Sequence, residues 1–263
     1  MEDFTKDLNF VLANTDKGYV LTTNKIGSKT LEDNATDFLQ FYKYIDGTLI
    51  NFGNNTLHKG RPGLIKKIFD NHLITCLLRD PLERTITGIV EELLVHDIKN
   101  YPGAYELASA NPVLLWLTER YFFPNITVNK GNEVHLAHAE SHKMVQHIVE
   151  NFMKQPIFRQ QWEKWWTEVI PYTWDKLKVS IHVRKYNEPL YHFIQEGMIK
   201  NYTTCLVQDI NFKHNNHHSN WMFKQPIRKT LDTITQDGSK FAKDFSSYIL
   251  EEEKYFKHLR DAS

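Results

Sequence analysis

The strongest constraint on the fold is an alternation of short apolar segments with helical ones in the first hundred residues. The apolar or β-branched segments predict strands at residues 18–23, 47–53 and 72–78. Helical patterns predict helices at residues 28–45, at 64–69 and from Pro81 onward. Strands that alternate with helices favour an α/β fold, with a central parallel sheet flanked by helices. Ligands of such folds bind at the carboxyl ends of the strands.

The second half of the sequence is richer in helical patterns. Helices are predicted at residues 112–123, 140–154, 158–169 and 239–259, strands at 176–183 and 203–210, and a polar loop at 213–226. Neither repeats nor a low-complexity linker interrupt the chain. We therefore expect a single domain over residues 1–263 with a helix-rich C-terminal half.

Composition limits the classes of function. The 32 basic and 32 acidic residues balance, which argues against a protein that relies on nonspecific nucleic-acid binding. Cys76 and Cys205 lie in apolar runs, as expected for free thiols in a reducing compartment. The polar N-terminus does not resemble a signal peptide, and no apolar window is long enough to cross a membrane. We expect a soluble, cytoplasmic protein.

The loop after the first predicted strand has the composition of a phosphate cradle. Its residues are Lys25, Ile26, Gly27, Ser28, Lys29 and Thr30. Unpaired N–H groups and the helix dipole attract anions at a helix start, and lysine charges and hydroxyl donors add to this. An ordinary turn capped by Ser28 is the alternative. The Walker spacing is absent, which disfavours a P-loop kinase or NTPase.

A second motif follows the strand at 72–78. It runs Arg79-Asp80-Pro81-Leu82-Glu83-Arg84, with Thr87 eight residues after Arg79. Alone, it could be a helix start with proline in the first turn. Together, the two loops resemble those of the sulfotransferase superfamily that uses 3′-phosphoadenosine-5′-phosphosulfate (PAPS), and the RDPLER form is closest to the carbohydrate sulfotransferases. The resemblance covers about residues 18–98; Lys29 replaces a common small hydroxyl residue and Thr87 replaces serine.

The resemblance implies a three-layer, P-loop-like α/β fold and transfer of a sulfuryl group to a hydroxyl or amine acceptor, possibly a glycan. The product of the donor would be adenosine 3′,5′-bisphosphate, and no metal is required. The resemblance assigns the 5′-phosphosulfate to Gly27, Ser28, Lys29 and Thr30, and the 3′-phosphate to Arg79 and Thr87. Lys25 would stabilise charge on the bridging oxygen as the S–O bond breaks. A kinase or NTPase, and an inactive nucleotide-binding module of the same fold, are the alternatives.

The general base is expected to be His58, in the loop after the strand at 47–53. An imidazole with a pKa near 6.5 can accept a proton at neutral pH, although a surface histidine is an equal alternative. Three histidines share one face of a predicted helix: His135, His138 and His142. They could form a metal site, contact the acceptor or simply lie on the surface. Trp162, Trp165 and Trp166 suit a helix core or a sugar-stacking platform. Lys224, Arg228 and Lys229 are candidates for closing the donor site.

Overall fold

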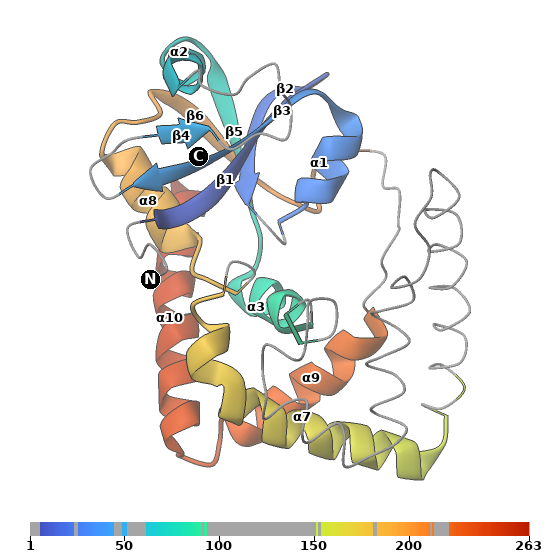
Figure 1. Ribbon diagram of the computed structural model, residues 1–263. Helices are drawn as coiled ribbons and strands as arrows, with labels where there is room; N and C mark the ends of the chain where they lie inside the picture. The colour runs from blue at the N-terminus through green and yellow to red at the C-terminus, as the bar shows by residue number, and fades with distance from the viewer. Residues whose placement is uncertain are drawn as a thin grey trace. The chain divides into compact units, whose positions relative to one another are not determined.

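A computed structural model describes residues 6–23, 26–44, 49–51, 62–90, 92–93, 151, 154–180, 183–210, 212 and 221–262 (Figure 1). The chain divides into two compact units. The first unit comprises Met1–Thr85, Arg184–Asn215 and Ser247–Ser263. The second unit comprises Ile86–Val183 and Asn216–Ser246. The prediction of a single domain stays a prediction.

The first unit contains a mixed β-sheet. Its six strands, among the described residues, are β1 (Lys6–Thr15), β2 (Gly18–Thr23), β3 (Ala35–Tyr44), β4 (Leu49–Asn51), β5 (Leu73–Leu78) and β6 (Asn201–Leu206). They lie in the order β4-β3-β1-β2-β5-β6. The pairs β2–β5 and β5–β6 are parallel, whereas β1–β2, β1–β3 and β3–β4 are antiparallel. The predicted parallel sheet is therefore wrong for the half of the sheet that carries β1, β3 and β4.

The error arises at two segments near the N-terminus. The predicted helix at residues 28–45 ends early: α1 covers Ser28–Asn34, and the chain then continues as β3. The strand β1 was not predicted; it forms a hairpin with β2 through a turn that ends at Gly18, whose φ is 92°. β3 pairs along β1, with Leu39 opposite Leu12. This long pairing outweighs the local helical spacing of residues 35–45, because tertiary context overrides weak propensity.

Most of the other predicted elements are found. The strands at 18–23 and 72–78 are β2 and β5, and α2 (Pro62–Asn71) and α3 (Pro81–Val90) follow as expected. In the C-terminal half, α7 (Pro156–Leu177) and α10 (Lys240–Asp261) are helical, and β6 covers the first part of the strand predicted at 203–210. The predicted helices at 112–123 and 140–154 lie outside the described residues, apart from residues 151 and 154.

Three segments in the C-terminal half differ from prediction. The strand predicted at 176–183 is wrong, because Lys176 and Leu177 end α7 and the chain then turns. The helix α8 (Asn187–Gln195) was not predicted. The helix α9 (Trp221–Ile234) begins inside the predicted polar loop and contains Pro226. The polar run before Trp221 and the proline inside the helix concealed it.

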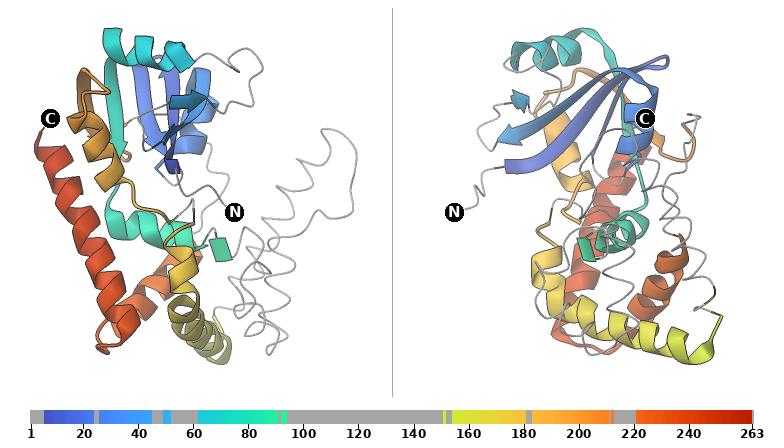
Figure 2. Two further views of the ribbon diagram at one scale, coloured as in Figure 1. Left: turned by 60° about the vertical axis from the view of Figure 1, so that its left-hand side comes forward. Right: turned by 45° about the vertical axis from the view of Figure 1, so that its right-hand side comes forward.

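The sheet of the first unit is buried on both faces. Phe10, Val11, Leu12 and Ala13 are consecutive in β1, and each is at most 1% exposed. Consecutive buried residues point to opposite faces of a sheet, so both faces are covered. The helices α1 and α8 lie on opposite faces of the sheet (Figures 1 and 2). α1 contributes Leu31 to the core, and Phe193 of α8 stacks on Phe10 with ring centroids 5.2 Å apart.

The second unit is built from helices among its described residues. Trp174 of α7 packs edge-on against Phe241 of α10, with ring centroids 5.8 Å apart. The Trp174 indole also donates a 2.7 Å hydrogen bond to Asp244, and Lys178 forms a 2.8 Å ion pair with the same carboxylate. All six tryptophans of the sequence fall within the ranges of the second unit, whereas both cysteines fall within the first. No helix among the described residues is long and apolar enough to cross a membrane.

Candidate functional site

The three parallel strands of the first unit end level with one another. Leu21 of β2 lies opposite Cys76 of β5, and each of these strands ends two residues later. Leu78, the last residue of β5, lies opposite Leu206, the last residue of β6. The loops that follow β2, β5 and β6 therefore leave the same edge of the sheet. This is the edge at which α/β folds bind ligands.

Thr22, near the end of β2, forms a hydrogen bond to Ile26 that the sequence did not indicate. The Thr22 hydroxyl is fully buried and donates a 2.6 Å hydrogen bond to the carbonyl oxygen of Ile26. The Ile26 N–H in turn donates to the carbonyl oxygen of Thr23, at 3.2 Å. These bonds join Ile26 to the last two residues of β2. A threonine in a buried strand is unremarkable in sequence, so no local signal could have revealed this role.

Gly27 links this loop to α1 in a conformation that requires glycine. Its φ is 74°, and a Cβ atom there would lie 2.9 Å from Cγ2 of Val207, the residue after β6. Other residues reach this left-handed region only with strain. The close approach packs the loop after β2 against the loop after β6.

The start of α1 does not place Ser28 at the capping position. Gly27 is the N-cap residue, and no side chain caps the helix. Ser28 is the first helical residue, so the turn capped by Ser28 is not what the structure has. The side chains of Ser28 and Thr30 are partly buried, and Lys29 lies between them in α1. The N-cap residue therefore supplies no side-chain hydrogen bond to the first N–H groups of α1.

The loop after β5 is a short, capped helix start. The Asp80 carboxylate accepts a 2.9 Å hydrogen bond from the Glu83 N–H, and its carbonyl oxygen accepts one of 2.9 Å from the Arg84 N–H. Pro81 opens α3, as predicted. Arg79 is partly buried at the end of β5. Burial lowers the pKa of the Arg79 guanidinium, the nearby Arg84 charge lowers it further, and Asp80 opposes both.

Arg84 is not a surface charge, although the sequence suggested only a motif match. Its side chain is 2% exposed, and its Nη1 donates a 2.5 Å hydrogen bond to the carbonyl oxygen of Arg184. Its guanidinium also lies 5.7 Å from the centre of the Tyr186 ring. Both contacts join residues about a hundred positions apart. Such partners could not be recognised from one sequence.

The structure thus brings Gly27, Ser28, Lys29, Thr30 and Arg79 to one edge of the sheet in the first unit. Thr87 lies farther along α3, in the part of the helix that belongs to the second unit, and is 9% exposed. The proposed catalytic residues Lys25 and His58 lie outside the described residues, as do His135, His138 and His142.

The tryptophan cluster of α7 is part of a core. Trp162, Trp165 and Trp166 are each at most 3% exposed, and the Trp165 and Trp166 rings lie 4.5 Å apart. Burial supports the core interpretation over an open sugar platform. Of the three basic residues considered for closing the donor site, Lys229 forms a 2.9 Å ion pair with Glu163.

Comparisons with protein families, curated proteins and solved structures found no match to this chain. Across the described ranges, no group of three or more His, Cys, Asp or Glu side chains is arranged to hold a metal ion.

Proposed function

We propose that the protein is a sulfotransferase that transfers a sulfuryl group from PAPS to a hydroxyl or amine acceptor. A carbohydrate is the acceptor class that the RDPLER motif favours. The observation that carries this proposal is the level ending of β2 and β5. It sets the Gly27 loop and Arg79 at one sheet edge, as a donor with a phosphosulfate and a separate 3′-phosphate would require.

The 5′ side of the donor would bind at the start of α1. Gly27 turns the chain into α1 with a φ of 74°, and the first N–H groups of a helix point toward the turn that precedes it. The hydrogen bond from the Thr22 hydroxyl joins Ile26, the residue before Gly27, to the end of β2. Lys25 would add the ammonium that stabilises charge on the leaving phosphate oxygen.

The 3′-phosphate would bind to Arg79, with the Thr87 hydroxyl as a second donor. A planar guanidinium can donate two parallel hydrogen bonds to a phosphate. Burial and the Arg84 charge lower the pKa of Arg79, whereas Asp80 opposes them. A bound dianion would act in the same direction as Asp80.

In the proposed reaction, the acceptor oxygen or nitrogen attacks sulfur and forms a new bond to it. The bond between sulfur and the bridging phosphate oxygen breaks, and the electron pair stays on the phosphate of adenosine 3′,5′-bisphosphate. His58 would accept the proton of the acceptor. The proposed step needs no metal ion.

Ligand binding tests the donor site. Calorimetry should detect binding of adenosine 3′,5′-bisphosphate to the full chain, and Arg79→Ala should weaken this binding by about tenfold or more, the value of one charge-assisted hydrogen bond. Arg260→Ala is the control, because Arg260 is an exposed arginine of α10. Absence of binding at millimolar ligand would refute the proposal. Binding of ATP only with Mg²⁺ would instead favour a kinase or NTPase.

Turnover tests the chemistry separately. A radiolabelled sulfate donor and a panel of glycan, alcohol and amine acceptors should give a labelled product. His58→Ala should abolish this turnover and leave affinity for adenosine 3′,5′-bisphosphate unchanged. Tight nucleotide binding without turnover on any acceptor would favour the inactive binding module.

A further inference from the structure

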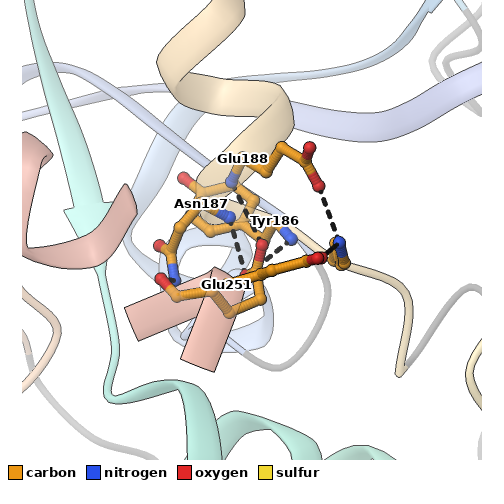
Figure 3. Close-up of polar contacts among 6 residues, drawn as sticks. Tyr186, Asn187, Glu188 and Glu251 are labelled. Carbon is orange, nitrogen blue, oxygen red and sulfur yellow. Dashed lines mark hydrogen bonds and ion pairs between the residues drawn. The ribbon is translucent and has the colours of Figure 1, made fainter. Parts of the chain in front are cut away.

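One partly buried segment of the first unit, residues 184–188, is held by hydrogen bonds to α10. The Glu252 carboxylate is 2% exposed and accepts hydrogen bonds from the backbone N–H groups of Tyr186, Asn187 and Glu188, at 3.0, 2.9 and 3.1 Å (Figure 3). These groups form the N-terminus of α8, where no local side chain caps the helix. A carboxylate at a helix N-terminus also interacts favourably with the helix dipole. The segment is therefore fixed at the backbone.

The same segment binds the chain on both sides of Arg79. On the strand side, the Tyr186 hydroxyl donates a 3.0 Å hydrogen bond to the carbonyl oxygen of Leu77, two residues before Arg79. On the helix side, Arg84 donates to the carbonyl oxygen of Arg184, and it lies five residues after Arg79. Tyr186 is fully buried and Arg84 nearly so.

The turn between these two anchors is itself closed by Asp80, which caps α3. Hydrogen bonds thus restrain the chain before Arg79 at Leu77, within its turn at Asp80 and after it at Arg84. A guanidinium on a fixed backbone loses less conformational freedom when it binds a phosphate than one on a mobile loop. The guanidinium of Arg84 adds a second positive charge close to Arg79.

We propose that Arg84 and Tyr186 are positioning residues that make the Arg79 turn selective for nucleotides with a 3′-phosphate. This inference rests on the proposed function. Neither side chain is among the groups assigned to contact the donor. Their effect would be on the 3′-phosphate alone, because the residue before Gly27 has separate hydrogen bonds: the Ile26 carbonyl oxygen accepts from the Thr22 hydroxyl, and the Ile26 N–H donates to the Thr23 carbonyl oxygen.

The test compares two nucleotides that differ only in the 3′-phosphate. Calorimetry gives the affinities of adenosine 3′,5′-bisphosphate and AMP for the full chain and for Arg84→Gln and Tyr186→Phe. Each variant should bind adenosine 3′,5′-bisphosphate more weakly and AMP as tightly as before. The ratio of bisphosphate affinity to AMP affinity should therefore fall by about tenfold for Arg84→Gln and by less for Tyr186→Phe. Arg260→Gln and Tyr191→Phe are the matched controls, and both should keep the wild-type ratio.

The outcomes separate this inference from the proposed function. If the unsubstituted protein binds both nucleotides equally or not at all, the proposed donor site is wrong. If it prefers the bisphosphate and the folded variants keep that preference, or lose affinity for both nucleotides equally, Arg84 and Tyr186 are only structural and the inference is wrong. If Arg84→Gln does not fold, Tyr186→Phe decides by the same criteria, since it removes one hydroxyl and keeps the ring.

Discussion

Gly27 shows how a single residue can be fixed by its surroundings. Gly27→Ala should destabilise the protein by about 2 kcal/mol, because alanine is strained at a φ of 74° and its methyl group would meet Val207. Chemical denaturation measures this change. Gly63→Ala in α2 is the matched control: a Cβ there meets no neighbour within 4 Å, so it should be neutral or slightly stabilising. Equal destabilisation by both substitutions would contradict the assigned role of Gly27.

Glu252 and its neighbour Glu251 offer a second comparison between single residues. Glu252→Ala should lower the free energy of unfolding by about 2–3 kcal/mol, because three buried N–H groups lose their acceptor. Glu251 forms an ion pair with Lys185 but its side chain is 54% exposed, so Glu251→Ala should cost less than about 1 kcal/mol. Urea denaturation of the two variants checks this; similar losses would contradict the capping role of Glu252.

At the scale of elements, Asp244 of α10 joins α7 in a way that depends on pH. The hydrogen bond from Lys178 lowers the pKa of Asp244 below 3.8, burial opposes this, and the Trp174 indole lowers it further. The ionised form is therefore favoured in the folded state. Its contribution to stability is complete above the unfolded pKa and is lost as the pH falls through the lower, folded value.

Asp244→Asn should consequently lower the melting temperature most near neutral pH. The difference from the unsubstituted protein should shrink as the pH falls below about 4, the region of an unperturbed Asp pKa. Thermal unfolding at several pH values measures it. Asp175→Asn is the control, because Asp175 also binds Lys178 but its side chain is 76% exposed. A difference that grows at acid pH would contradict the assignment.

The individual strands and helices show which parts of the fold a sequence can predict. β2, β5, α2 and α3 were predicted because each carries its own apolar period and its own boundary residues. β1 and β3 were missed because their main stabilisation is pairing with each other, which no local pattern contains. The motif loops were located correctly as the turns after β2 and β5. The hydrogen bonds of Thr22, Tyr186 and Glu252 were not predicted. Those of Tyr186 and Glu252 join segments 64 or more residues apart.

At the scale of the whole molecule, the tryptophans and cysteines report on different units. Cys76 is fully buried in β5, and burial raises its pKa to about 12, so it should resist thiol reagents until the first unit unfolds. Tryptophan fluorescence reports on the second unit. α3 and α10 each have residues in both units. Unfolding of one unit should therefore also unfold part of a helix that belongs to the other. We therefore expect both probes to change together.

A urea titration of Cys205→Ser, in which Cys76 is the sole thiol, measures the two probes in one sample. Coincident transitions would support the single domain predicted from sequence. A fluorescence change that is complete while Cys76 remains unreactive would show that the two units unfold independently, and would contradict that prediction.

The pairing of β5 with β6 also bears on how the protein is made. Leu73 pairs with Asn201, so the ribosome adds 127 residues, 74–200, between the two partners. At ordinary rates of translation this takes about 10 s. During that interval β5 is an open sheet edge on a nascent chain, and Glu252, which caps α8, has not yet been synthesised. The edge of β5 is therefore exposed to other chains until β6 has left the ribosome.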